Sequence, residues 1–376
     1  MPMCSPSVLI IMQDLHTVNY FFITKKYIIR LYYEINSATI QSGCRPTIAN
    51  SINIDKGKKT IMKMTKKKAG LGVAVIVAVL VLWSVLKPAP AEAVEITPYG
   101  SLNYMISNNE NASGVSTSKA ENNGSSIGVK LSDELSEGIE GFATLEVAIL
   151  DGNVDDNGSA PFDSKLAYAG VDMGDAGILS AGRQNSVFKG AVTSHTDVFS
   201  EYGNKAAQKL FSRDSHTVVY SNTIGALTFD NQVKIDGTTG KSGVDVYETA
   251  ATFDMNEDVK LGAAYSDDKV NEVKYYGAGL TVAVSDVTSI GYNHTIKDNT
   301  VTNLETSANE VAVSHTIVDT TFSVGYGKIE DGNAYSTVGA KKKIGSNLEL
   351  YGAFESTDVA SGLDTSGMSA GIKFKF

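Results

Sequence analysis

The chain contains few residues whose types and spacing could carry out chemistry. Gly367-Met-Ser-Ala-Gly371 has the Gly-x-Ser-x-Gly spacing of a serine nucleophile. That nucleophile works on a strained strand-to-helix turn beside an oxyanion hole, whereas this stretch lies in an alternating segment without a following helix. The four histidines after residue 93 are scattered and lack the spacing of a metal site. The sequence therefore predicts no enzyme activity, no metal site and no cofactor.

The segment that holds this motif alternates strictly between apolar and polar residues. One side carries Met368, Ala370, Ile372, Phe374 and Phe376, and the other carries glycine, serine and lysine. This is the period of a β-strand with one apolar face and one wet face. Lipid is the simplest cover for the apolar face, and a strand in lipid must pair every backbone N–H and C=O with neighbouring strands. The segment therefore predicts a closed transmembrane barrel.

The same alternation recurs along the chain, and we predict sixteen segments. They lie at about 95–106, 125–132, 138–150, 165–173, 177–184, 214–222, 225–234, 245–253, 259–267, 272–284, 287–297, 309–317, 321–329, 334–344, 348–357 and 366–376. Short connections alternate with longer ones such as 107–124, 151–164 and 298–308, which is typical of the two rims of an outer-membrane barrel. The predicted fold class is all-β, a sixteen-stranded antiparallel transmembrane β-barrel wide enough for an aqueous channel.

The amino-terminal part has the pattern of a targeting segment. A basic start from Met62, an apolar run at 69–86 and Ala91-Glu-Ala93 predict a secretory signal peptide at 62–93 that is cleaved after Ala93. Because the apolar run has 18 residues, an uncleaved membrane anchor is the alternative. Residues 1–61 show no sustained period, and we expect them to be untranslated or disordered. The barrel is then expected to span 94–376.

The charge of the predicted mature chain excludes one class of partner. Residues 94–376 carry 20 Lys and Arg against 38 Asp and Glu, a formal net charge of −18. Without a basic patch to neutralise phosphates, nucleic acid is not an expected partner. Both cysteines precede residue 94, so this part has neither a disulfide framework nor a thiolate metal site.

One connection, residues 185–213, is about 29 residues long and has no alternation of its own. A loop of that length usually has a function. In a channel, its expected role is to fold inward and narrow the pore.

Several stretches carry a resemblance to a known family. They are Ser126-Ile-Gly-Val-Lys130, Lys165-Leu-Ala-Tyr-Ala-Gly170, Gly182-Arg183 and Thr196-Asp-Val-Phe-Ser-Glu-Tyr-Gly-Asn-Lys205. These stretches resemble the general diffusion porins of Gram-negative outer membranes, a family of sixteen-stranded trimers. The resemblance implies a homotrimer within outer-membrane lipid and lipopolysaccharide. It also implies passive diffusion of small hydrophilic solutes and ions.

The resemblance further implies a pore constriction in which acids of the third loop face a basic wall. The acids fall on Asp197 and Glu201, and the basic positions fall on Lys165 and Arg213, with Arg183 just before the loop.

Two further basic positions of the family are serines here, Ser101 and Ser126, so half of the wall is uncharged. Lys205 or Lys209 could replace part of that charge. With the net charge of −18, this predicts a weak preference for cations.

Two rival functions remain open from the sequence. An outer-membrane barrel enzyme would need a Ser/His or Asp/His pair that converges at the rim, and normally a narrower, filled barrel. A non-conducting barrel adhesin or assembly protein would need a plugged lumen.

Overall fold

The computed structural model describes residues 94–150, 161–237, 243–360 and 362–376, and the backbone of four strands nearer the amino terminus. The chain divides into two units, Met1–Leu86 and Lys87–Phe376. In the first unit, strands β1 (Leu9–Met12), β2 (Thr17–Thr24), β3 (Tyr27–Glu34) and β4 (Ser37–Ser42) form an antiparallel sheet in that order. The predicted signal peptide at 62–93 lies outside the described residues, and the expectation for 1–61 stays a prediction.

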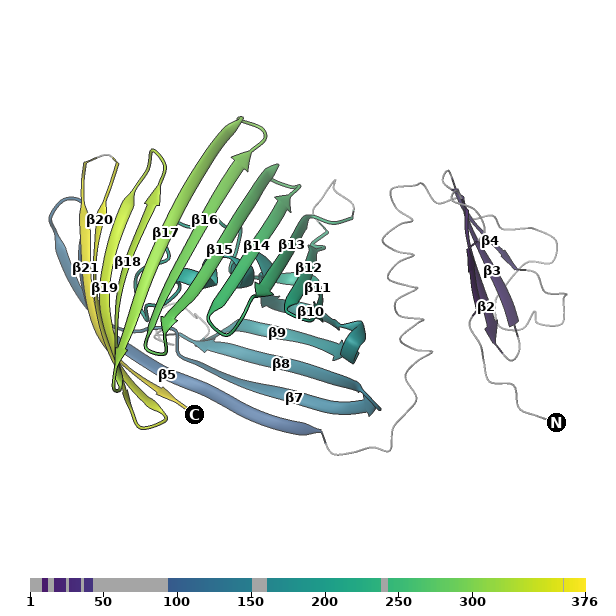
Figure 1. The fold of residues 1–376 in the computed structure, drawn as a ribbon, viewed down its shortest axis with the longest axis horizontal. Helices are drawn as coiled ribbons and strands as arrows, with labels where there is room; N and C mark the ends of the chain where they lie inside the picture. The colour runs from purple at the N-terminus through teal and green to yellow at the C-terminus, as the bar shows by residue number, and fades with distance from the viewer. Residues whose placement is uncertain are drawn as a thin grey trace. The chain divides into compact units, whose positions relative to one another are not determined.

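The second unit is a closed antiparallel ring of strand segments (Figure 1). In chain order they are β5 (Glu95–Glu110), β6 (Ser116–Asn122), β7 (Ser126–Ser136), β8 (Ile139–Ile149), β9 (Phe162–Asp172), β10 (Ile178–Asn185), β11 (Arg213–Ile224), β12 (Leu227–Lys234), β13 (Val246–Asp254), β14 (Val259–Asp268), β15 (Val273–Ser285), β16 (Thr288–Asn299), β17 (Leu304–Ile317), β18 (Thr320–Ile329), β19 (Ala334–Ile344), β20 (Leu348–Asp358) and β21 (Thr365–Lys375). Every strand pairing in the ring is antiparallel.

Segments β6 and β7 are two parts of one barrel strand. The second half of β5 pairs with β6, from Tyr104 opposite Asn122 onward, and its first half pairs with β7, up to Ser101 opposite Ser126. The ring therefore has sixteen strands, which confirms the predicted fold class.

Some predicted loops were too long. Residues 107–124 contain the end of β5 and all of β6, and the connection expected at 298–308 shrinks because β16 reaches Asn299 and β17 begins at Leu304. The sequence of β6, Ser-Thr-Ser-Lys-Ala-Glu-Asn, is polar on both faces. Backbone pairing forms this strand, and it gives no hydrophobic alternation to detect.

The ring closes where β21 meets β5. Lys375 lies opposite Ser101, and Phe376 and Gly100 exchange two backbone hydrogen bonds, with N···O distances of 2.9 and 3.1 Å. The Phe376 ring also lies over Gly100, where an added Cβ would be 2.7 Å from it. The predicted terminal strand is therefore the closing strand of the barrel.

The two faces of the ring differ in polarity as the alternation predicts. Large apolar side chains such as Ile106, Leu145 and Met368 are more than half exposed on the outer face. Side chains of the inner face include the buried Ser107 and Glu310. Lipid would cover the outer face. Among the described residues no helix is long and apolar enough to cross a membrane, a finding that concerns helices alone.

Candidate pore constriction

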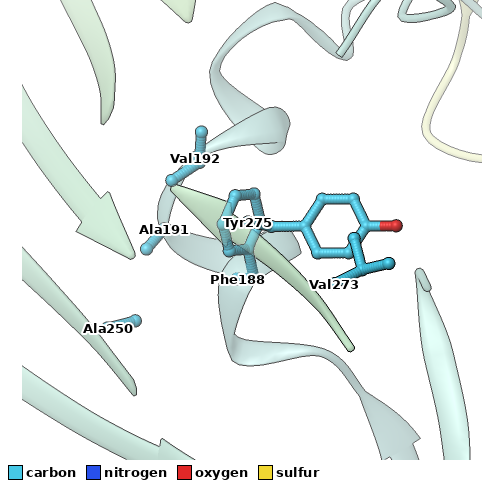
Figure 2. Packing of buried hydrophobic residues seen from close by; sticks show 6 residues of the cluster. All are labelled: Phe188, Ala191, Val192, Ala250, Val273 and Tyr275. Atoms are coloured by element: carbon cyan, nitrogen blue, oxygen red, sulfur yellow. The ribbon is translucent and has the colours of Figure 1, made fainter. Parts of the chain in front are cut away.

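The long connection 186–212 lies against the polar inner face of the ring. It begins with α2 (Val187–Ala191) and η2 (Thr193–Thr196), two short helices that the sequence did not predict. Phe188 is fully buried in a cluster with Val192, Val273 and Tyr275, shown in Figure 2. We call residues 186–212 the third loop.

Two glycines let the backbone of the third loop touch the wall. A Cβ added to Gly262 in β14 would lie 1.8 Å from the carbonyl oxygen of Ala191. A Cβ added to Gly291 in β16 would lie 1.8 Å from the carbonyl oxygen of His195. Contacts that close are possible only where the strand has no side chain. These glycines therefore determine the position along the barrel axis at which the third loop crosses the barrel.

Three buried glutamates of the wall hold the third loop by its backbone. At the start of the loop, Glu248 of β13 accepts hydrogen bonds from Ser186 Oγ at 2.8 Å and from the Phe188 N–H at 3.4 Å. Ser186 also caps α2 by accepting from the Lys189 N–H. We call residues 196–207 the inner turn of the loop. Near its end, Glu355 of β20 accepts from the Gly203 N–H at 2.8 Å.

Glu310 of β17 is the most connected of these acids and is only 1 % exposed. Its Oε1 accepts from the N–H groups of Ala206 (2.7 Å) and Ala207 (3.2 Å) and from the Tyr335 hydroxyl (2.7 Å). Its Oε2 accepts from Thr196 Oγ1 and Asn293 Nδ2, both at 3.0 Å. A carboxylate that accepts this many bonds anchors both ends of the inner turn of the loop.

The two predicted loop acids lie on this inner turn. Asp197 is exposed, and its Oδ2 lies 3.8 Å from Lys189 Nζ. Glu201 is half-buried, and burial raises the pKa of its carboxyl group. Asp197 therefore presents its charge to water more fully than Glu201 does.

The two loop lysines considered as substitutes differ in their surroundings. The Lys205 ammonium group forms an ion pair with Glu355. Burial lowers the pKa of the Lys209 ammonium group, and the charges that act on it are those of Glu310, Lys189 and Asp197. Neither lysine forms a contact with Ser101 or Ser126 among the described residues.

The structure brings Lys165, Ser126 and Ser101 together on the wall. Ser101 and Ser126 are cross-strand partners, and Lys165 Nζ donates to Ser126 Oγ at 3.3 Å. Lys165 also forms an ion pair with Glu146 of β8, with an N···O distance of 2.6 Å, and the Tyr99 hydroxyl donates to Glu146 Oε2 at 3.0 Å. The charge of Lys165 is thus largely cancelled by an acid that sequence reasoning missed.

The two arginines lie apart from that group. Arg213 begins β11 opposite Asn185, where the third loop rejoins the ring. Arg183 donates from Nε to the Ser164 carbonyl at 2.9 Å and from Nη1 to Ser215 Oγ at 3.2 Å. In register Arg183 lies opposite Ala167, which itself lies opposite Leu145. Because Leu145 faces outward, this register places Arg183 on the outer face as well.

Comparison with known proteins agrees with this architecture. A family model described as Gram-negative porin matches residues 73–374. Outer membrane protein U of Vibrio parahaemolyticus is 28% identical over 207 residues, which are 52% of this chain and 59% of that protein. The chain thus matches only about three fifths of the length of this relative.

Solved structures show the same fold at low identity. An anion-selective porin from Comamonas acidovorans has a TM-score of 0.63 at 16% identity, covering 76% of this chain and 100% of that one. The trimer form of OmpT, an outer membrane protein of Vibrio cholerae, has a TM-score of 0.60 at 14% identity, covering 76% and 100%. With a closed sixteen-stranded ring and a family match over most of its length, the chain belongs to the Gram-negative porin family.

Proposed function

We propose that the protein is a water-filled channel through which small hydrophilic solutes and ions diffuse passively across the outer membrane. The observation that carries this proposal is the pairing of a closed ring with a polar inner face, along which the third loop is held by three buried glutamates. A loop seated in this way narrows a wide barrel without filling it.

The proposal includes the surroundings and the assembly of the channel. The signal peptide at 62–93 directs the chain across the inner membrane, and the mature barrel lies in outer-membrane lipid and lipopolysaccharide as a homotrimer. The family membership and the trimer form of OmpT support this assembly. The channel needs no cofactor and carries out no catalysis.

A test of the channel is swelling of liposomes that contain the purified barrel. Small neutral sugars should cause rapid swelling, and larger oligosaccharides should cause little, because the third loop narrows the passage. Liposomes that do not swell in any sugar would favour a non-conducting adhesin instead.

Weak cation preference is the finer part of the proposal. Asp197 and Glu201 supply negative charge on the loop, Ser101 and Ser126 leave the wall short of positive charge, and Glu146 cancels Lys165. A unit charge about 4 Å from a passing ion contributes about 1 kcal/mol in water and about 4 kcal/mol at an effective dielectric constant of 20.

Zero-current potentials in a salt gradient test this preference. Ser126→Arg and Asp197→Asn should each shift the zero-current potential in the direction of anion selectivity. Both shifts should shrink at 1 M salt, where the Debye length is about 3 Å. An anion-selective wild-type channel at low salt would contradict the assignment of the loop acids.

A further inference from the structure

Three lysines that sequence reasoning did not assign lie together on the inner wall next to the closing seam. Lys373 and Lys375 of β21 lie opposite Asn103 and Ser101 of β5, and Asn103 is a buried inner-face residue. Lys341 of β19 lies two strands away. We call Lys341, Lys373 and Lys375 the lysine cluster.

Contacts with Tyr351 and with the third loop show which way the lysine cluster faces. Tyr351 of β20 lies opposite both Lys341 and Gly371, and its hydroxyl donates to Asn103 Oδ1 at 2.9 Å. Lys341 Nζ donates to the carbonyl oxygen of Val198 in the third loop at 2.8 Å. The cluster therefore faces the lumen beside the same loop that carries Asp197 and Glu201.

The charges within the lysine cluster are not balanced. Glu349 is the acid among them, and its Oε2 lies 3.8 Å from Lys375 Nζ. Lys341 donates to the Val198 carbonyl oxygen and has no ion pair within the described part of the chain. Lys373 is half-buried and lies opposite Glu349 in register. The charges that act on it are those of Lys375, Glu349, Lys165 and Lys341, so the lysines outnumber the acid. Ammonium groups that act on one another's charge repel, and a bound anion relieves that repulsion.

We propose that the lysine cluster is a binding station for small oxyanions, such as phosphate or the phosphate and carboxylate groups of solutes, on the lumen wall. This inference rests on the proposed channel function. The lysine cluster thereby places positive charge beside Ser101, since Lys375 lies directly opposite it. This charge opposes that of Asp197 and Glu201 and keeps the proposed cation preference weak.

The chemistry of the station favours weak and reversible binding. Lysine ammonium groups are compact point charges with three donors each, and they bind phosphate oxygens without the fixed fork of arginine. The site is open to the aqueous lumen, so salt screens it. An oxyanion is expected to dwell on the wall and to obstruct the passage of other ions while it is bound.

The test is single-channel recording of the purified barrel in 0.1 M KCl, with inorganic phosphate added to one side and the ionic strength matched by chloride. Phosphate should lower the current in a concentration-dependent way. Lys373→Gln and Lys375→Gln should each weaken this block about fivefold, the factor that about 1 kcal/mol per removed charge gives. Both variants should also shift the zero-current potential toward cations.

Lys342→Gln is the matched control. Lys342 follows Lys341 on the same strand, so its side chain lies on the opposite face of the wall, where it pairs with Asp319 at 3.6 Å. Its loss should therefore leave the phosphate block unchanged. Stepwise conductance of each variant shows that it has folded. A wild-type channel that conducts without any phosphate block, or an equal block in Lys373→Gln and the wild type, would overturn this inference alone. A wild-type barrel without conductance would overturn the proposed function itself.

Discussion

Replacing Glu310 with glutamine should loosen the third loop without opening the barrel. The carboxylate accepts five hydrogen bonds, three on Oε1 and two on Oε2. Glutamine keeps the size of the side chain but turns one oxygen into an NH2 group, which then faces at least two donors. The strand pairing of β17 with β16 and β18 is made by the backbone and stays intact.

The magnitude follows from the bonds that are lost. A hydrogen bond to a charged group contributes about 1.5–3 kcal/mol, so the loss of two costs about 3–6 kcal/mol in the attachment of the loop. Local opening free energies range from zero up to that of global unfolding, about 5–15 kcal/mol for a domain. A cost of this size is enough to convert a seated loop into one that opens frequently.

Hydrogen exchange measures this directly at the Ala206 and Ala207 amides, which donate to Glu310. Exchange at these amides should accelerate at least about a hundredfold for 3 kcal/mol, and single-channel current should become noisier. Glu305→Gln, an exposed acid of the same strand, is the control and should change neither. Unchanged exchange in Glu310→Gln would refute the view that this glutamate anchors the loop.

Four further outcomes are expected. Glu146→Gln should expose the charge of Lys165 and shift the zero-current potential toward anions at low salt, and adding Lys165→Gln should cancel that shift. Gly291→Val should displace the third loop, because even a Cβ meets a loop carbonyl at 1.8 Å, and it should change conductance more than it changes the yield of folded barrel. Deleting Phe376 removes two backbone hydrogen bonds at the seam and should sharply lower the amount of heat-modifiable barrel in outer-membrane fractions. Because burial raises the pKa of Glu201, its negative charge should be lost at a higher pH than for an ordinary carboxyl group, so cation preference measured across a pH series should start to fall while exposed carboxylates are still ionised.

Sequence alternation was sufficient for most of the barrel because one face of each strand must be apolar. It failed at β6, whose two faces are both polar and whose formation depends only on pairing with β5. It also made loops too long wherever strands continue past the apolar band, as β16 does at its end and β17 does at its start.

Less of the pore constriction than of the barrel could be predicted from the sequence. The contact of Lys165 with Ser126 fits the family resemblance, but the neutralising Glu146 depends on the irregular register between β8 and β9. The lysine cluster depends on the register across the seam, which joins residues more than 250 positions apart. Glu248 and Glu310 fall within predicted strands, yet their partners are loop amides that no spacing reveals.

The proposed channel is tested most directly by the conductance of planar lipid bilayers that contain the purified chain from residue 94 onward. A water-filled passage past a seated loop should give stepwise, long-lived current increments that scale with salt concentration. Correctly folded barrel that inserts into the bilayer without any current step would contradict the proposal.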